Sequence, residues 1–81
     1  MLSNTHSLAE LPVGQRCRVT ALTSSGAGRR RILDLGIVPG TEIEAVLKSL
    51  SGGITAYLIR GALIAIRKED AVNIIVSNII I

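Results

Sequence analysis

Aromatic side chains are almost absent from this 81-residue chain, which has no Trp, no Phe and only Tyr57. Proteins that bind single-stranded nucleic acid stack successive bases on several aromatic rings. Grooves that bind Pro-rich peptides are lined by such rings as well. One tyrosine supplies neither surface. The composition therefore counts against base-stacking recognition and against Pro-rich peptide binding, while contact with phosphate groups stays open.

Cysteine and long apolar runs are equally scarce. Cys17 is the only cysteine, so an internal disulfide is excluded and a reducing cytoplasm is the expected location. The longest uninterrupted apolar run is residues 62–66, whereas a membrane-spanning helix needs about 20 such residues. Residues 1–10 lack the basic and apolar regions of a secretory signal. We expect a cytoplasmic protein that is not embedded in a membrane.

Groups that perform catalysis or hold cofactors are few. His6 and Cys17 are the only pair of the Cys/His kind, and Cys17 alternates in phase with apolar neighbours, which predicts a buried thiol. The chain has no C-x-x-C motif for a metal, and the glycines of residues 26–28 lack the rest of a phosphate-binding loop. We predict that the protein is not an enzyme and has no cofactor and no metal site.

Aliphatic residues, by contrast, are abundant. Hydrophobic residues make up 48% of the chain, charged residues only 19%, and the mean hydropathy is +0.51. This composition is the reverse of that of disordered proteins, and a chain of this length closes about one apolar core. We therefore expect a single domain over residues 1–81.

Period-two alternation of apolar and polar residues predicts mainly β structure. Strand-like segments lie at residues 16–22, 42–48, 54–58, 62–67 and 73–76. A capping-box pattern at residues 7–10 predicts a short N-terminal helical turn. Residues 23–28 look like a flexible loop, and residues 29–35 fit a short helix after the first strand. Closing so few strands on themselves buries an aliphatic face, so we predict a small SH3-like β-barrel of about five strands, with an OB-like barrel as the alternative.

Some aliphatic residues fall out of phase with the predicted core. In the segment at residues 54–58, we expect Ile54, Ala56 and Leu58 to point inward. The residues predicted to face outward are Leu22, Val46, Tyr57, Ile59, Leu63 and Ile75, and residues 79–81 add an apolar tail. Apolar side chains gathered in one exposed patch mark a surface that binds another protein. The sequence therefore predicts a protein-binding module, and a weak homo-oligomer is compatible with the same surface.

Nine Lys and Arg against six Asp and Glu give a net charge of +3. A small basic domain is attracted to nucleic acid, to an anionic membrane surface or to an acidic protein. The sharpest cluster is Arg29, Arg30 and Arg31. Because Arg is enriched at protein interfaces, we count these three residues among the candidate partner contacts.

Residues 31–41 read R-I-L-D-L-G-I-V-P-G-T, which closely resembles the R-L-x-x-L-G-[LI]-x-P-G-[TS] signature of the FeoA family. Residues 8–14 are similar to the L-x-x-L-x-x-G start of that family, and Gly61 with residues 64–67 is similar to its late hairpin. Residues 71–76 resemble its A-x-x-I-x-V ending. The resemblance covers about residues 7–76.

The signature also has a physical interpretation. Gly36 is expected to end the short helix in a left-handed conformation, and Pro39 with Gly40 to form a type II turn. Leu35, together with Ile32 and Ile37, is expected to plug one end of the barrel. These structural positions leave the Arg side chains and the outer aliphatic residues as candidate contacts.

The resemblance to the FeoA family implies an SH3-like barrel and an accessory or regulatory role in bacterial ferrous-iron uptake. It implies a partner, FeoB, the membrane permease with a cytoplasmic GTP-binding domain, and no catalytic residue. The same fold is similar to the C-terminal module of metal-dependent repressors. Two alternatives stay open, a small basic nucleic-acid-binding barrel and a carrier or sensor that binds ferrous iron, although we expect no nucleic-acid partner.

Overall fold

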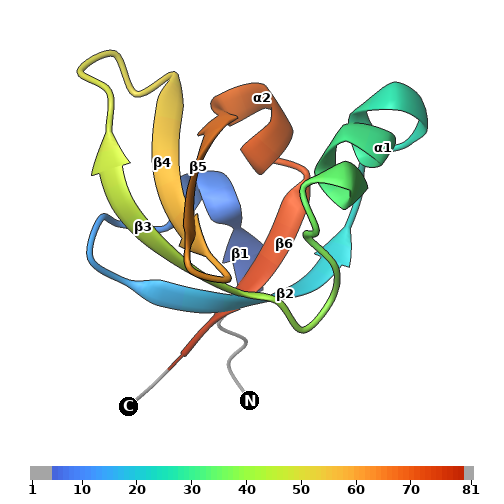
Figure 1. Ribbon diagram of the computed structural model, residues 1–81, viewed down its shortest axis with the longest axis horizontal. Helices are drawn as coiled ribbons and strands as arrows, with labels where there is room; N and C mark the ends of the chain where they lie inside the picture. The colour runs from blue at the N-terminus through green and yellow to red at the C-terminus, as the bar shows by residue number, and fades with distance from the viewer. Residues whose placement is uncertain (1–4, 80–81) are drawn as a thin grey trace.

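Six antiparallel strands form one sheet in the computed structural model, which describes residues 5–79 (Figure 1). The strands are β1 (Thr5–Ser7), β2 (Arg16–Leu22), β3 (Glu42–Lys48), β4 (Ile54–Ile59), β5 (Ala62–Arg67) and β6 (Ile74–Asn78). The hydrogen-bonded order is β1-β6-β2-β3-β4-β5, so the sheet is open, with β1 and β5 as its edges. The mainly β fold class is confirmed, with six strands where about five were predicted.

The additional strand is β1, which pairs with β6 through His6 opposite Val76. Its three residues are polar, so no alternation of apolar residues indicates it. At the other end, the backbone N–H of Ile79 donates to the carbonyl of Arg16 at 3.1 Å, which continues the pairing beyond β6. The rest of the predicted apolar tail, Ile80 and Ile81, lies outside the described residues.

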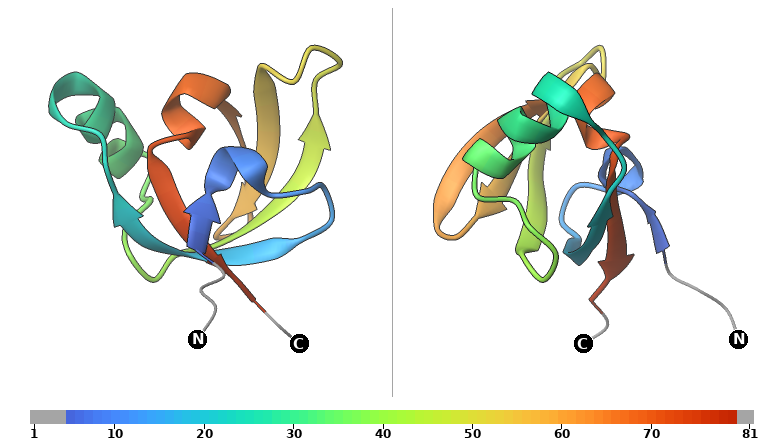
Figure 2. Two further views of the ribbon diagram at one scale, coloured as in Figure 1. Left: turned by 180° about the vertical axis from the view of Figure 1, so that it is seen from behind. Right: turned by 90° about the vertical axis from the view of Figure 1, so that its right-hand side faces the viewer.

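Three short helices accompany the sheet: η1 (Leu8–Glu10), α1 (Gly26–Asp34) and α2 (Lys68–Ala71). The predicted N-terminal turn is confirmed as η1, where the Ser7 backbone N–H donates to the Glu10 carboxylate at 3.0 Å. Both α-helices lie at the same end of the sheet as the β3–β4 hairpin (Figure 2). Within residues 5–79, no helix is long and apolar enough to span a bilayer.

Helix α1 begins at Gly26, three residues before the predicted start, so the flexible loop predicted at residues 23–28 is wrong over residues 26–28. Its C-terminal end follows the sequence prediction. Gly36 has φ +84°, its N–H donates to the carbonyl of Leu33, and the N–H of Ile37 donates to that of Ile32. These two bonds form a Schellman motif. In this motif, an apolar contact commonly joins the two residues of the wider bond, which here are Ile32 and Ile37.

Ile32 and Ile37 are buried at this helix end, as predicted, but Leu35 is exposed and does not plug the core. Leu35 is the C-cap residue of the helix, and 41% of its surface is exposed. The predicted type II turn follows. The N–H of Thr41 donates to the carbonyl of Val38 at 3.0 Å, and Gly40 has φ +97° after Pro39.

Two glycines of the α1 region are expected to respond oppositely to the same substitution. Gly36→Ala places a Cβ in the left-handed region and should lower the free energy of unfolding by about 1–2 kcal/mol. In Gly28→Ala, inside α1, the added Cβ meets only Ser24 Cβ, at 3.9 Å. This substitution should raise the free energy of unfolding by up to about 1 kcal/mol. Urea unfolding of both variants measures these changes, and a neutral Gly36→Ala would contradict the assigned helix end.

The core shows that the predicted phase of β4 is wrong. Tyr57 and Ile59 are buried, with 2% and 1% of their surfaces exposed, while Ile54 and Leu58 lie on the outer face. The Tyr57 hydroxyl donates to the carbonyl of Leu8 at 3.4 Å. The buried hydrophobic residues are Leu8, Leu11, Cys17, Val19, Ile32, Ile37, Ile43, Ala45, Tyr57, Ile59, Ile66, Ala71, Ile74 and Val76.

Strand β3 also departs from regular alternation. The pairing with β4 shifts register between Ala45 and Leu47, which face Tyr57 and Ala56, respectively. Such a bulge inserts one extra residue and sends the following side chains to the other face. Leu47, predicted to point inward, is therefore exposed.

Candidate protein-binding surface

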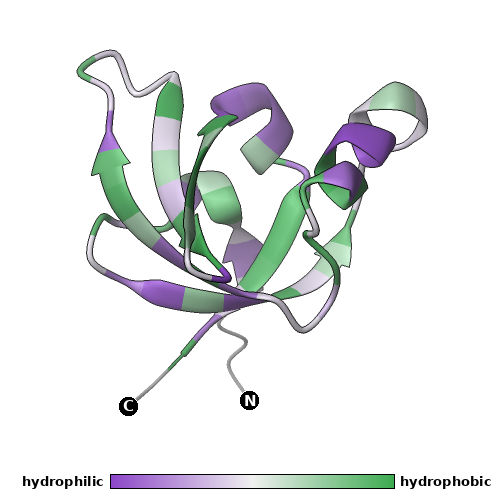
Figure 3. Cartoon of the chain, viewed as in Figure 1, coloured by the Kyte–Doolittle hydropathy of each residue, from purple (hydrophilic) through white to green (hydrophobic). Residues whose placement is uncertain are grey.

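An apolar surface covers the outer side of strands β3, β4 and β5. Leu58 lies directly opposite Leu63, and Ala56 lies between Leu47 of β3 and Ala65 of β5. Residues directly opposite each other in antiparallel strands share a face. We call these five residues the outer sheet face; the strands that carry them are largely hydrophobic in Figure 3.

The aliphatic side chains of this face are solvent-exposed among the described residues. Leu63 has 61% of its surface exposed and Leu58 has 39%. No helix covers this side of the sheet in the views of Figures 1 and 2. The face belongs to adjacent strands, so its apolar residues form a contiguous patch, which is the arrangement typical of protein-binding sites.

Charged residues border the outer sheet face where β3 begins and β4 ends. Glu44 lies opposite both Leu58 of β4 and Arg16 of β2. A shallow hollow of about 190 Å³ at this border is lined by Arg16, Glu44, Leu58 and Arg60, among other residues. An apolar centre with a polar border is the usual anatomy of a protein interface.

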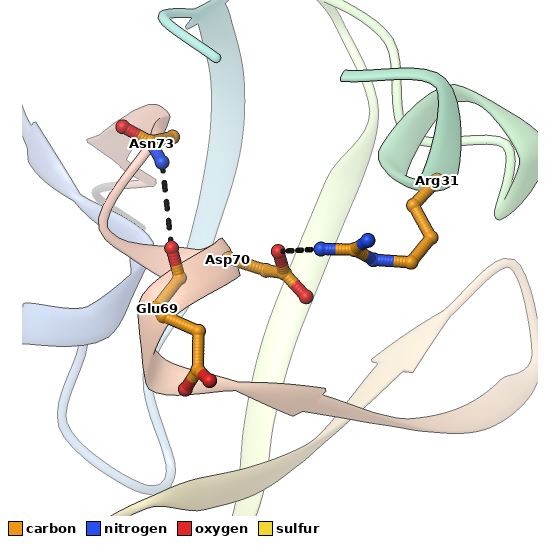
Figure 4. A network of polar contacts seen from close by, with 4 residues as sticks. All are labelled: Arg31, Glu69, Asp70 and Asn73. Atoms are coloured by element: carbon orange, nitrogen blue, oxygen red, sulfur yellow. Dashed lines mark hydrogen bonds and ion pairs between the residues drawn. The ribbon is translucent and has the colours of Figure 1, made fainter. Parts of the chain in front are cut away.

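The three consecutive arginines do not act as one cluster. Arg31 donates to the Asp70 carboxylate at 2.6 Å and thus joins α1 to α2 (Figure 4). The hydrogen bond and the charge of Asp70 raise the pKa of Arg31, so this guanidinium stays positively charged. Arg29 donates to the backbone carbonyl of Leu22 at 3.2 Å. Arg30 is exposed on α1, and all three remain predicted partner contacts.

A larger pocket lies between α1 and the β5–α2 segment. Its volume is about 380 Å³, and its apolar lining includes Ile32 and Leu35 from α1 and Ala65 from β5. Arg31 and Asp70 line the same pocket. No sequence pattern indicates this pocket, because its walls come from separate parts of the chain that only the fold brings together.

The residues predicted to face outward differ in how far the structure exposes them. Leu63 and Val46 are exposed, whereas Leu22 is half-buried and packs against the core. Tyr57 and Ile59 belong to the core itself, so the structure removes them from the candidate contacts. Because Tyr57 is the only aromatic residue, its burial also leaves no ring on which a nucleic-acid base could stack.

Cys17 and His6 do not form a reactive pair. Burial of the Cys17 thiol raises its pKa from about 9 to about 11, which keeps it protonated near neutral pH. His6 lies in β1 rather than in an irregular segment, and its Nε2 is 2.6 Å from Oδ1 of Asn78. Within residues 5–79, no group of three or more His, Cys, Asp or Glu side chains is arranged to hold a metal ion.

Cys17 is expected to be unreactive in the folded protein. With a pKa of about 11, only about one thiol in a thousand is ionised at pH 8, and the side chain is fully buried. Reaction with an aromatic disulfide reagent at pH 8 should therefore be slow and limited by opening of the structure. The reaction should become immediate in 6 M guanidinium, and immediate reaction without denaturant would contradict the assigned burial.

The comparison with protein families decides the classification. A family model described as the FeoA domain matches residues 6–78, which is nearly the whole chain. The chain belongs to the FeoA family. FeoA proteins are small accessory proteins associated with ferrous iron transport and are not a known enzyme family. Among proteins of curated function, none matches the chain.

Solved structures agree with this classification. A FeoA-like protein from Clostridium acetobutylicum is 30% identical, with a TM-score of 0.89 over 98% of this chain and 92% of its own. FeoA from Stenotrophomonas maltophilia, solved with zinc and described as a prokaryotic SH3 domain protein, is 28% identical, with a TM-score of 0.76 over 88% of each chain. The SH3-like prediction is confirmed.

A manganese-dependent transcriptional repressor shares the fold. Its TM-score is 0.86 at 15% identity, over 96% of this chain and 43% of the repressor. At this identity, the likeness concerns the fold alone. It agrees with the predicted similarity between this FeoA-family chain and one module of metal-dependent repressors.

Proposed function

We propose that this FeoA-family protein is a cytoplasmic accessory or regulatory protein of bacterial ferrous-iron uptake. It acts by contact with the cytoplasmic part of a FeoB-type permease, which includes the GTP-binding domain. The observation that carries this proposal is the exposed outer sheet face on a chain of the FeoA family. Leu58 and Leu63 form its centre, and Glu44 and Arg16 lie at its border.

The groups that could perform chemistry support a binding role rather than a reaction. The Cys17 thiol is buried and protonated, and Arg31 is engaged with Asp70. Covering the exposed aliphatic side chains with another protein removes apolar surface from water, which favours binding. The relative from Stenotrophomonas maltophilia is described as a candidate activating factor of ferrous iron transport, which agrees with an accessory role.

A calorimetric titration of the full chain with the isolated cytoplasmic part of FeoB tests this proposal. The titration is done without nucleotide, with GDP and with a non-hydrolysable GTP analogue. We expect saturable binding in at least one nucleotide state. Apolar contact should also give a negative heat-capacity change when the titration is repeated at several temperatures. Absence of binding in all three states would overturn the proposal.

A further inference from the structure

The loop of the β3–β4 hairpin projects an aliphatic side chain into solvent. Residues 49–53, with the sequence S-L-S-G-G, join the two strands, and Leu50 has 109% of the reference surface exposed. Ile54, the first residue of β4, is exposed beside it. Full exposure of Leu50 means that the side chain contributes nothing to the core, so packing does not explain its presence.

Most backbone donors around the loop are paired within the hairpin. The N–H groups of Ser49 and Gly52 donate to backbone carbonyls within the hairpin at 2.9 Å. The N–H groups of Gly53 and Ile54 donate to the hydroxyls of Ser51 and Ser49, at 3.3 and 3.2 Å. Backbone groups that are already paired cost less to remove from water than free ones. The loop can therefore enter a less polar environment without losing these bonds.

Cationic side chains surround this apolar loop. Lys48 directly precedes the loop, and Arg67 of β5 lies opposite Ile54. The N–H of Lys68 donates to the carbonyl of Gly53 at 2.9 Å, which fixes the start of α2 against the hairpin. We call Lys48, Leu50, Ile54, Arg67 and Lys68 the hairpin tip. None of these residues is among the five that define the outer sheet face, although Ile54 lies on the same side of β4 as Leu58.

The nearby carboxylates do not cancel this charge. Asp70 accepts a hydrogen bond from Arg31 at 2.6 Å, so its charge is compensated by α1. Glu69 is the other carboxylate of α2 and directly follows Arg67 and Lys68 in the sequence, so one carboxylate stands against the three cations of the tip. The tip is therefore a local region of positive charge next to exposed aliphatic groups.

The charge of the whole molecule is concentrated at the same end. The β3–β4 hairpin, the end of β5, α1 and α2 lie together at one end of the sheet (Figures 1 and 2). Lys48 with the hairpin loop, Arg67, α1 and α2 hold six of the nine Lys and Arg residues and three of the six carboxylates, a difference equal to the net charge of +3. The remaining cations and carboxylates balance. A one-sided positive field orients the protein toward an extended anionic surface.

We propose that the hairpin tip binds the surface of an anionic lipid bilayer, with Leu50 and Ile54 in the interfacial region and the three cations against lipid headgroups. The shape of the tip favours a bilayer over an acidic protein. A fully exposed leucine on a protruding loop needs a matching cavity on a protein partner, whereas a bilayer interface adapts to it. Basic residues beside inserted apolar groups are the features by which peripheral proteins bind anionic membranes.

Sedimentation of the full chain with lipid vesicles tests this inference. We expect binding to phosphatidylcholine vesicles that contain about 30% phosphatidylglycerol, little binding to pure phosphatidylcholine, and weaker binding as salt rises. Leu50→Ser should reduce the partition coefficient about tenfold or more. The double variant Lys48→Ser/Lys68→Ser should reduce the partition coefficient about twenty-fivefold, since each cation near an anionic surface contributes about fivefold.

Leu63→Ser is the matched control, because Leu63 is also a solvent-exposed leucine but lies on the outer sheet face. Its vesicle binding should equal that of the unchanged protein, and circular dichroism should show that all variants fold. Absence of binding to anionic vesicles at low salt, or binding unaffected by Leu50→Ser, would overturn the inference.

The vesicle experiment is independent of the proposed permease contact. Failure of the permease titration leaves the vesicle result unchanged, because the two surfaces share no residue. If Leu50→Ser weakens binding to the FeoB cytoplasmic part in solution but leaves vesicle binding intact, the tip binds an acidic protein surface and the lipid assignment is wrong.

Discussion

Tyr57→Ala is expected to lower the free energy of unfolding by about 3–5 kcal/mol, because it empties the space of the largest fully buried side chain. A chain of this length has a total stability of about 4–12 kcal/mol, so the variant should be barely folded or unfolded at 25 °C. Urea unfolding followed by circular dichroism measures the loss.

The adjacent residue provides the control for this experiment. Leu58 lies on the outer sheet face, and Leu58→Ala should change the free energy of unfolding by less than about 1 kcal/mol. Equal losses at the two positions, or a larger loss at Leu58, would mean that β4 faces the other way and that the outer sheet face has been assigned to the wrong residues.

The largest effect on binding is expected from charge on the outer sheet face. Leu58→Asp or Leu63→Asp should weaken binding to the FeoB cytoplasmic part at least about thirtyfold, since each places an unpaired carboxylate at the centre of the proposed interface. Both side chains are exposed in the free protein, so the fold should tolerate the change. Calorimetric titration gives the ratio of dissociation constants.

Leu33→Asp serves as the matched control for these binding variants. Leu33, on α1, has 40% of its surface exposed, almost the same as the 39% of Leu58, but lies on a helix rather than on the sheet. We expect binding within about threefold of the unchanged protein. A large loss with Leu33→Asp and none with Leu58→Asp would place the interface on α1, beside the arginines.

The fold was largely predictable because its signals are local. The Gly36 helix end and the Pro39–Gly40 turn depend on backbone conformations that few residues adopt, so the sequence indicates them directly. The phase of β4 was not predictable in this way, because apolar residues occur on both of its faces. Its orientation is set by pairing with β3 and β5, and the bulge at Leu47 adds a shift that alternation does not reveal.

The candidate site was predicted only in its general character. The sequence indicated surplus aliphatic residues and correctly gave Leu63 an exposed position, but Leu58 was expected in the core. The pairing of Leu58 with Leu63 depends on the two-residue turn at Arg60 and Gly61, where φ is positive for both residues. The link between Arg31 and Asp70 joins distant segments, which a one-dimensional pattern does not show.

The measurement that tests the central claim most directly is an NMR titration of the ¹⁵N-labelled full chain with the unlabelled cytoplasmic part of FeoB. We expect shifted or broadened amide signals concentrated on residues 44, 47, 56, 58, 63 and 65, with the hairpin tip little changed. Unchanged spectra at saturating FeoB, or changes confined to α1 and α2, would contradict the claim.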